Sequence, residues 1–157
     1  MDRSTIRALI MDVDGTLTDG GIYMGHDGEV LKKFHVKDGL GIHIILPEHN
    51  VIPIILTGRS SSIVRNRAKE MGVEYVLQGS TDKLTDMKQL LESLQIELEQ
   101  TAYIGDDIND LQAMEAVGLR GCPKDAAREI REISDFISEY LGGNGAVRDF
   151  IEWIVQT

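Results

Sequence analysis

Two carboxylates stand directly after the first apolar segment of the chain. Residues 6–11 are apolar apart from Arg7, and Asp12, Asp14 and Gly15 follow them. Such a segment is typical of a buried parallel strand, and open α/β sheets bind their ligands at the carboxyl ends of the strands. Residues two apart in an extended chain share a face, so these carboxylates repel each other unless a cation or a proton intervenes. The segment therefore predicts a divalent metal site, for which phosphate is the usual partner.

This acidic segment has two other interpretations. An Asp-rich surface turn after a strand is common and needs no ligand. A calcium loop of the EF-hand type needs its glycine later and a glutamate at the twelfth position. Counted from Asp12, Gly15 comes too early and the twelfth residue is Tyr23. The calcium loop is therefore disfavoured, and later segments must decide between the turn and the metal site.

A second segment repeats the order of apolar strand, polar residue and glycine. Thr57, Gly58 and Arg59 follow the apolar residues 51–56, and three serines at 60–62 then signal the start of a helix. A threonine hydroxyl and free N–H groups at a helix N-terminus suit a phosphate oxygen. The alternative, which this segment alone favours, is an ordinary strand–turn–helix connection with a serine cap.

Lys83 stands in the first turn of a helix that is predicted to begin at Asp82. The helix dipole favours anions there, so a lysine is out of place unless it points at a phosphate and a carboxylate. In isolation, a solvated surface lysine is the more common case.

The fourth segment again places carboxylates at the end of an apolar strand. Asp106, Asp107 and Asp110 follow residues 102–105. Asp106 could complete a metal site with Asp12. Asp107 or Asp110 could add a further ligand, directly or through water, or could orient the other groups. The alternative is a helix with a capped, acidic first turn.

Length and composition limit the classes of protein. The chain has 157 residues and a formal net charge of −10, from 16 Lys and Arg against 26 Asp and Glu. The length suits one domain over residues 1–157, and the charge argues against nucleic acid or an anionic membrane as main partner. A single cysteine, Cys122, suits a reducing compartment, and we expect a cytoplasmic protein. We recognise no leader peptide, and no apolar run reaches 18 residues.

The remaining pattern indicates an α/β fold, with a Rossmann-like parallel sheet flanked by helices. Residues 20–36 predict a β-hairpin inserted after the first strand, whose apolar side chains need a cover such as a partner subunit. Asp38 is expected to cap a helix through Leu46, and Phe150 and Ile154 mark an apolar helix face. The other predicted strands cover residues 51–56, 73–77 and 102–105, and the other predicted helices cover residues 60–71, 82–94 and 109–117.

Taken in order, the four segments resemble the motifs of the haloacid dehalogenase superfamily, in its phosphatase branch. The matching residues are Asp12-x-Asp14-Gly15-Thr16, Thr57-Gly58, Lys83 and Gly105-Asp106-Asp107-x-x-Asp110. The resemblance implies Asp12 as nucleophile and Asp14 as general acid and base. It implies that Thr57 and Lys83 hold the phosphoryl group. It also implies Mg²⁺ as cofactor, held by Asp12, the backbone carbonyl of Asp14, and Asp106.

These residue types suit phosphomonoester hydrolysis, which depends on positioning and on neutralising charge. Mg²⁺ and Lys83 would neutralise the phosphoryl oxygens so that the anionic Asp12 can approach phosphorus. Asp14 would protonate the departing alkoxide and then activate water against the aspartyl phosphate. An aspartate at this second place separates the phosphatases of the superfamily from its transport ATPases, which favours hydrolysis over a long-lived phosphoenzyme.

The gaps between the motifs hold no cap domain of ordinary size. The hairpin at 20–36 and the glycine-rich residues 142–148 resemble features of a small, capless subfamily, the 3-deoxy-D-manno-octulosonate 8-phosphate phosphatases. That resemblance implies a homotetramer with four hairpins at its centre, and a C-terminal tail, here residues 142–157, that closes a neighbour's site. It implies a sugar acid phosphate of lipopolysaccharide biosynthesis as substrate.

Recognition of the substrate's far end depends on basic groups. Arg59 can pair with a carboxylate bidentately, beside Gly58, and Lys37 and a neighbour's Arg148 are further candidates. Relatives that act on nine-carbon sugar acid 9-phosphates (2-keto-3-deoxynononate or N-acylneuraminate) tend to carry Glu where this chain has Arg59. Such a substrate is the alternative to the octulosonate. A non-catalytic binding protein of the same fold is less favoured, because all four motifs keep their charged residues.

Overall fold

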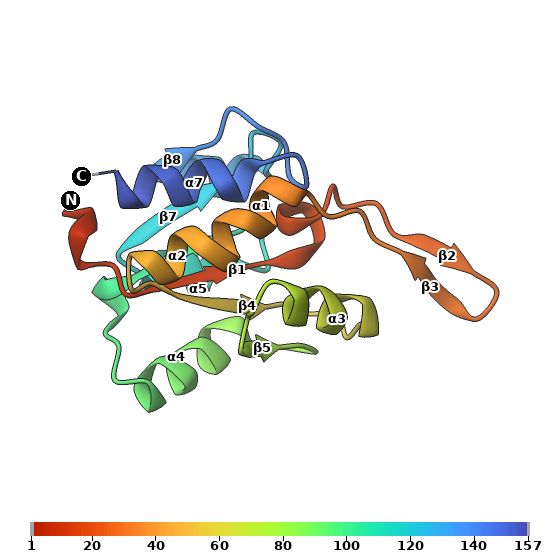
Figure 1. The fold of residues 1–157 in the computed structure, drawn as a ribbon, viewed down its shortest axis with the longest axis horizontal. Coiled ribbons are helices and arrows are strands. Elements are labelled where there is room, and N and C mark those ends of the chain that lie inside the picture. The colour runs from red at the N-terminus through yellow and green to blue at the C-terminus, as the bar shows by residue number, and fades with distance from the viewer. Residues whose placement is uncertain (1, 157) are drawn as a thin grey trace.

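The computed structural model describes residues 2–156 and has a parallel sheet of six strands at its centre (Figure 1). The strand order is β5-β4-β1-β6-β7-β8, and each neighbouring pair runs parallel. The predicted α/β fold with a parallel sheet is confirmed. The strands are β1 (Ala8–Met11), β4 (Ile52–Leu56), β5 (Tyr75–Leu77), β6 (Thr101–Ile104), β7 (Leu119–Cys122) and β8 (Phe136–Ile137).

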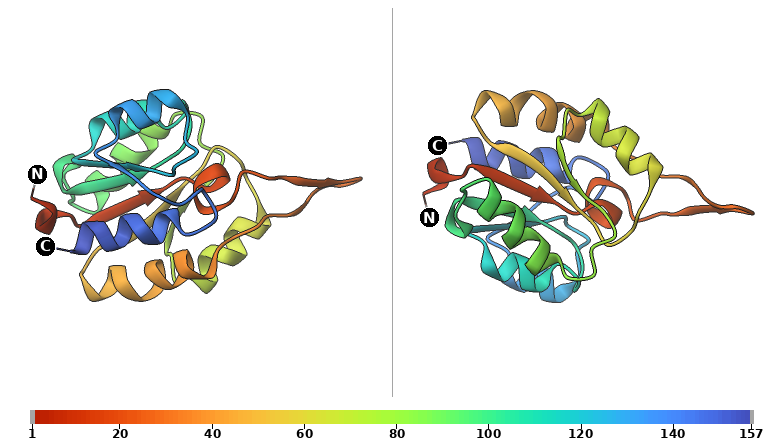
Figure 2. Two further views of the ribbon diagram at one scale, coloured as in Figure 1. Left: turned by 90° about the horizontal axis from the view of Figure 1, so that it is seen from above. Right: turned by 90° about the horizontal axis from the view of Figure 1, so that it is seen from below.

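Helices cover both faces of the sheet (Figure 2). One face carries α1 (Val36–Leu40), α2 (Leu46–Glu48), α3 (Ser62–Glu70) and α7 (Ala146–Val155); the other carries α4 (Lys83–Ser93), α5 (Leu111–Ala116) and α6 (Arg128–Ile133). A widened helical turn, Gly41–Ile45, joins α1 to α2. Short helical turns also lie at Arg3–Thr5 and Leu98–Gln100, and Val13–Leu17 is a kinked turn in which Asp14 and Gly15 are not helical. Among residues 2–156, no helix has the length and apolar character needed to cross a bilayer.

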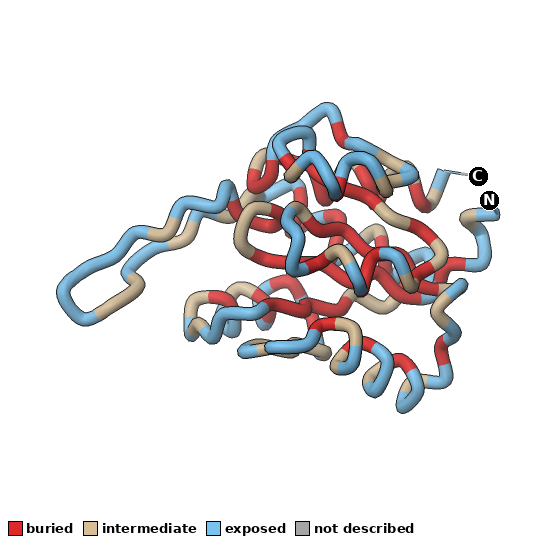
Figure 3. The backbone as a smooth tube through the Cα atoms, turned by 180° about the vertical axis from the view of Figure 1, so that it is seen from behind, coloured by how far each residue is buried: buried red, intermediate tan, exposed pale blue. Residues whose placement is uncertain are grey.

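The uninterrupted apolar run of β1 is explained by burial on both faces of the sheet. Leu9 and Met11 pack under α7 and the Val36–Glu48 stretch, whereas Ala8 and Ile10 pack against the layer of α4, α5 and α6. All four are at most 1% exposed, and Figure 3 shows the buried backbone concentrated in this sheet. Burying a large aliphatic side chain contributes about 1.5–3 kcal/mol, so the strand is fixed up to the point where Asp12 ends the apolar run.

The predicted hairpin is present and protrudes from the body (Figures 1 and 3). Its antiparallel strands are β2 (Tyr23–Gly25) and β3 (Gly28–Leu31). The expected continuation of the second arm as far as Val36 is wrong, because helix α1 begins at Val36. Large apolar side chains remain exposed on the hairpin, namely Tyr23, Met24, Val30 and Leu31.

Asp38 does not cap the helix that follows the hairpin. His35 takes that place, and its Nδ1 accepts a hydrogen bond from the Lys37 N–H at 3.3 Å. Asp38 lies inside α1, is 1% exposed, and accepts a hydrogen bond from the Arg148 N–H at 2.8 Å. A helix that starts three residues earlier than expected therefore uses this carboxylate to join α1 to α7.

The predicted C-terminal tail is a tight turn followed by a core helix. Gly143 N–H donates to the Thr16 carbonyl at 3.0 Å, and Gly142 N–H donates to Asp125 Oδ1 at 2.9 Å. The inner face of α7 is at most 1% exposed: Ala146, Val147, Phe150, Ile151 and Ile154. The apolar helix face is confirmed. Residues 142–156 pack on their own chain, whereas the resemblance implied a tail that closes a neighbour's site. Residue 157 lies outside the described residues.

Candidate active site

The sheet brings the motif residues to one edge. Strand β1 lies between β4 and β6, and Met11 is in register with both Ile55 and Ile104. The residues that follow these three strands therefore emerge side by side at their carboxyl ends. The N-terminus of α4 reaches the same place and supplies Lys83.

Three carboxylates meet at this edge. Asp12, Asp106 and Asp110 each offer an oxygen, and these oxygens lie within 4.8 Å of one another. Asp12 is 4% exposed and Asp110 is fully buried. The structure thus brings Asp12 and Asp106 together, and a plain surface turn does not describe them.

Lys83 is a buried ion-pair partner and not a surface lysine. Its Nζ lies 2.7 Å from Asp12 Oδ1 and 2.6 Å from Asp110 Oδ1, and the residue is only 6% exposed. Burial alone would lower the pKa of Lys83, but the charges of Asp12 and Asp110 outweigh burial and raise it. The lysine therefore stays cationic beside Asp12 and Asp110.

Asp110 orients its neighbours. Its Oδ1 also accepts a hydrogen bond from the Tyr103 hydroxyl at 2.7 Å, and its Oδ2 accepts from the N–H groups of Asp106 and Asp107 at 3.2 and 3.5 Å. Sequence reasoning missed Tyr103, whose only signal was its inward place on β6. Asp107 is exposed, and its Oδ1 accepts from the Ile108 N–H at 2.8 Å, so it stabilises its own turn.

Gly15 makes room for Asp106. A Cβ on Gly15 would lie 2.0 Å from Asp106 Oδ2, and the φ of Gly15 is +93°. The Thr16 hydroxyl donates to Asp106 Oδ1 at 3.0 Å. The turn after β1 therefore supports the carboxylate that follows β6, and only glycine fits at its tightest point.

The cluster carries excess negative charge. Burial, with help from the Asp110 carboxylate, raises the pKa of Asp12 well above its usual value, although Lys83 opposes this. Burial likewise raises the pKa of Asp106 to about 6. Three carboxylates facing one ammonium suit a divalent cation, and oxygen-only donors suit a hard ion such as Mg²⁺ better than zinc.

Thr57 and Gly58 lie at the end of β4. Thr57 is 2% exposed, its N–H donates to the Leu77 carbonyl at 2.9 Å, and its carbonyl accepts from the Ser80 N–H at 3.2 Å. A Cβ on Gly58 would be 3.5 Å from the Ser80 carbonyl oxygen, so sterics alone do not require glycine here. Thr57 is therefore held by β5 and by the segment that leads into α4.

The Asp14 carboxylate belongs to a second group of charges at the edge of the site. We call Asp14, Glu29, Lys32 and Arg59 the rim cluster. Lys32 Nζ donates to Asp14 Oδ1 and lies 3.2 Å from Glu29 Oε2. Arg59 lies 4.0 Å from Asp14 Oδ2 and 3.6 Å from Glu29 Oε2, and its side chain is 49% exposed. Arg59 is therefore at the site edge, as its sequence position suggested.

Sequence reasoning missed the two rim residues that come from the hairpin. Glu29 lies on β3, and Lys32 follows that strand directly. The only available signal was alternation, which places Lys32 inward between the exposed Leu31 and Lys33. The hairpin thus contributes side chains to the site of its own chain.

The structure does not bring Lys37 and Arg148 into this site. Arg148 Nε donates to Glu152 Oε1 at 2.6 Å, and its Nη1 donates to the Lys37 carbonyl at 3.4 Å. Both residues line a separate groove of about 440 Å³ with His35 and Tyr140. Within residues 2–156, no hydrogen bond or ion pair joins either residue to the carboxylates of the site.

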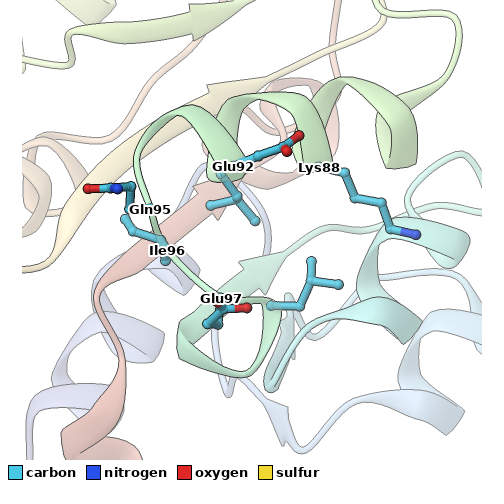
Figure 4. A pocket seen from close by; sticks show the side chains of 7 residues that line it. Lys88, Glu92, Gln95, Ile96 and Glu97 are labelled. Carbon is cyan, nitrogen blue, oxygen red and sulfur yellow. The ribbon is translucent and has the colours of Figure 1, made fainter.

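Two hollows flank α4. One, of about 500 Å³, lies beside Lys83 and is lined also by Ser80, Asp82 and Ile108. The other, of about 420 Å³, lies at the far end of the helix among Lys88, Glu92, Gln95, Ile96 and Glu97 (Figure 4). The residues that line this second hollow come just before β6, at the amino ends of the strands. The hollow therefore lies at the opposite edge of the sheet from the carboxylates.

Known proteins resemble the whole chain. A family model described as haloacid dehalogenase-like hydrolase matches residues 67–151. The chain is 43% identical over 150 residues to the 3-deoxy-D-manno-octulosonate 8-phosphate phosphatase of Salmonella typhi. The match covers 96% of this chain and 79% of that protein. It is 41% identical over 152 residues to the Yersinia pestis enzyme, and the match covers 97% of this chain and 81% of that protein.

Solved structures agree with this match. The Moraxella catarrhalis 3-deoxy-D-manno-octulosonate 8-phosphate phosphatase, in complex with magnesium, phosphate and KDO, superposes with a TM-score of 0.93 at 43% identity, over 99% of this chain and 88% of that chain. The cobalt-bound Haemophilus influenzae enzyme gives a TM-score of 0.95 at 37% identity, over 99% of this chain and 91% of that chain. With its motifs in this order and its carboxylates at this edge of the sheet, the chain belongs to the haloacid dehalogenase-like hydrolases, in the capless family of 3-deoxy-D-manno-octulosonate 8-phosphate phosphatases.

Proposed function

We propose that this protein is a Mg²⁺-dependent phosphatase that hydrolyses 3-deoxy-D-manno-octulosonate 8-phosphate through an aspartyl-phosphate intermediate. The observation that carries the proposal is the buried Asp12, ion-paired to Lys83 and next to Asp106 at the end of β1. The activity of the relatives supports the same reaction.

The metal site would be formed by Asp12, Asp106 and the backbone carbonyl of Asp14. When bound there, Mg²⁺ supplies positive charge to the phosphoryl oxygens. Lys83 would add a second positive charge, and Thr57 and Gly58 would offer a hydroxyl and an N–H group to the same oxygens. Asp110 keeps Lys83 in place through the 2.6 Å ion pair.

Asp12 and Asp14 would carry out the two chemical steps. An Asp12 oxygen forms a bond to phosphorus while the bond from phosphorus to the ester oxygen breaks, and the Asp14 carboxyl gives its proton to that oxygen. In the second step, the Asp14 carboxylate takes a proton from water as the water oxygen bonds to phosphorus. The bond between Asp12 and phosphorus then breaks, which releases phosphate and restores both groups.

The sugar acid carboxylate would be recognised by Arg59. This guanidinium is half exposed, and its distances of 4.0 and 3.6 Å to Asp14 and Glu29 exceed those of charged hydrogen bonds. It is therefore available to donate to a ligand. Lys37 and Arg148 remain candidates only across an interface between subunits, because within one chain they face the separate groove.

The activity is tested with a panel of phosphate esters. We expect 3-deoxy-D-manno-octulosonate 8-phosphate to give a higher kcat/KM than glucose 6-phosphate or p-nitrophenyl phosphate, and a nine-carbon sugar acid 9-phosphate to be weaker. Chelation should remove activity and added Mg²⁺ should restore it. Equal efficiency on glucose 6-phosphate would overturn the substrate, and turnover that survives exhaustive chelation would overturn the metal requirement.

The same panel tests Arg59. Loss of a charge-assisted contact costs about 1.5–3 kcal/mol, so Arg59→Ala should lower kcat/KM for the sugar acid roughly tenfold or more. The loss should be much smaller for p-nitrophenyl phosphate, which has no carboxylate. Arg65→Ala, on the exposed side of α3, is the matched control and should behave as wild type. An equal loss on both substrates would remove Arg59 from substrate recognition.

A homotetramer built around the hairpins is the assembly we propose. Tyr23, Met24, Val30 and Leu31 are each more than half exposed, and such a group of apolar side chains on a protruding hairpin needs a cover. Sedimentation velocity should give the mass of four chains. Met24→Ser combined with Val30→Ser should shift the protein to smaller species, and a monomeric wild type would refute the assembly.

A cytoplasmic location is also proposed. Cys122 is free and buried, which fits a reducing compartment. Cell fractionation followed by immunoblotting tests this, and recovery of the protein outside the cytoplasmic fraction would contradict it.

A further inference from the structure

We propose that Lys32 is a positioning residue that holds the Asp14 carboxylate where it exchanges protons with the leaving group and with water. The inference rests on the proposed function of Asp14 as general acid and base. It assigns the protruding hairpin a part in the reaction of its own chain, in addition to any contact between subunits.

The burial of Lys32 carries the first step of the argument. Its side chain is 0% exposed, although it follows a strand whose last two residues, Val30 and Leu31, are more than half exposed. Burying an ammonium group is strongly unfavourable unless carboxylates compensate for the lost water. Lys32 has two such partners, Asp14 and Glu29, so its position is fixed by these contacts and not by solvent.

The anchorage of Lys32 gives the second step. Glu29 Oε1 accepts a hydrogen bond from the Ser61 hydroxyl at 2.5 Å. Ser61 caps α3 through a hydrogen bond from the Val64 N–H, and its own N–H donates to Gln78 Oε1 at 2.7 Å. The chain of contacts from Asp14 through Lys32 and Glu29 therefore ends on α3 and on the segment after β5, two elements of the body.

Asp14 needs this support more than Asp12 does. Asp12 is held by the buried Lys83, and its N–H donates to the Ile104 carbonyl at 3.1 Å. Asp14 lies in the turn after β1, with φ −74° and ψ 112° outside the helical region, and its side chain is 20% exposed. Each of the two proposed catalytic carboxylates thus has a buried lysine of its own.

A direct contact between Lys32 and substrate does not fit this geometry. A side chain with no exposed surface can reach a ligand only by leaving Asp14 or Glu29, whereas Arg59 is open to solvent at the same rim. Lys32 should therefore influence the rate of the chemical steps and not the binding of the sugar acid.

The test uses Lys32→Met, which keeps the length of the side chain and removes its charge. We expect kcat to fall about ten- to a hundredfold, at or below the lower end of the roughly 10²–10⁴-fold attributed to a positioned acid or base, with KM changed little. With p-nitrophenyl phosphate, whose leaving group needs no proton, Asp12 should still be phosphorylated. The hydrolysis step needs Asp14, so acid quench should trap more aspartyl phosphate than in wild type.

The control is Lys33→Met, the next residue along the chain. Its side chain is 50% exposed and lies 3.7 Å from Asp19, so turnover should match wild type. Lys32→Arg keeps the charge and should recover much of the lost kcat. If Lys32→Met does not fold, Glu29→Gln weakens the same anchorage and should give a smaller loss with the same accumulation of phosphoenzyme.

Three results would overturn the inference. Wild-type turnover in Lys32→Met shows that Asp14 needs no support from the hairpin. A raised KM with unchanged kcat makes Lys32 a substrate contact. Lower activity without accumulated phosphoenzyme, or with lost Mg²⁺ affinity, makes it a structural residue. Acid quench of the wild-type enzyme distinguishes failure of the inference from failure of the proposed function. If the wild type itself forms no aspartyl phosphate, the proposed function fails and the inference fails with it.

Discussion

Asp12→Asn should lower kcat by at least about 10³-fold, because an amide cannot attack phosphorus and a nucleophile contributes on this scale. The loss should be the same for the sugar acid phosphate and for p-nitrophenyl phosphate, since both would pass through the proposed phosphoenzyme on Asp12. Steady-state assays measure the loss. Acid quench with labelled substrate should trap phosphate on wild type and none on the variant.

The fold should survive this substitution. Burial, with the nearby Asp110, raises the pKa of Asp12 well above its usual value, which means that the ionised form is disfavoured in the folded protein. A neutral side chain of the same shape removes that unfavourable charge, and Lys83 keeps its ion pair with Asp110. The Tm should therefore stay near that of wild type or rise.

Asp27→Asn is the matched control for Asp12→Asn. Asp27 lies in the exposed turn of the hairpin, so the same chemical change should leave kcat and Tm unaltered. If Asp12→Asn kept wild-type turnover, Asp12 would not be the nucleophile. If the variant unfolded, the lost activity would say nothing of the chemistry, so circular dichroism belongs beside every assay.

The carboxylate and lysine positions could be predicted because each follows from a local rule. An apolar run of strand length ends in Asp12, another ends before Asp106, and parallel strands place their carboxyl ends together. Lys83 was marked by its unusual place at a helix start, and the structure explains it by two buried ion pairs. These local rules placed each residue at a strand end or a helix start, and the order of the four motifs in the superfamily indicated that they form one site.

Lys32 and Glu29 could not be placed in the same way. Their position depends on how the hairpin folds back over Asp14 and Ser61, which is a tertiary contact with no motif. Alternation indicates that the Lys32 side chain points inward. This signal is weak, because a lysine beside exposed apolar residues is more often solvated. The rim cluster therefore emerges only when the path of the hairpin is known.

The glycines at 142–145 show how one composition supports two opposite interpretations. Three glycines in four residues suit a flexible segment, such as the tail that the family resemblance implied. In the structure a Cβ on Gly142 would lie 1.9 Å from the Gly15 carbonyl oxygen, and Gly143 has φ +66°. These glycines allow two backbones to touch, so they fix the turn before α7 against the turn after β1.

Phe150→Ala should lower the free energy of unfolding by about 3–5 kcal/mol, the usual cost of emptying a buried aromatic site. Phe150 is 0% exposed, its ring lies 5.5 Å from that of Phe136 and 5.8 Å from Trp153, and a Cβ on Gly121 of β7 would come within 2.6 Å of it. Helix α7 is therefore part of the core, and emptying this position leaves a cavity between the helix and the sheet. Urea denaturation should show the loss.

Leu141→Ala is the matched control for Phe150→Ala. Leu141 precedes the same turn but is 46% exposed, so its truncation should change the free energy of unfolding by no more than about 0.5 kcal/mol. A flexible tail would make both substitutions equally mild, and it would let a chain cut after Leu141 stay folded. We expect that truncation to unfold the protein, because it removes the buried face of α7 and uncovers β1 and β7. A folded and active truncated chain would return residues 142–156 to the role of a tail.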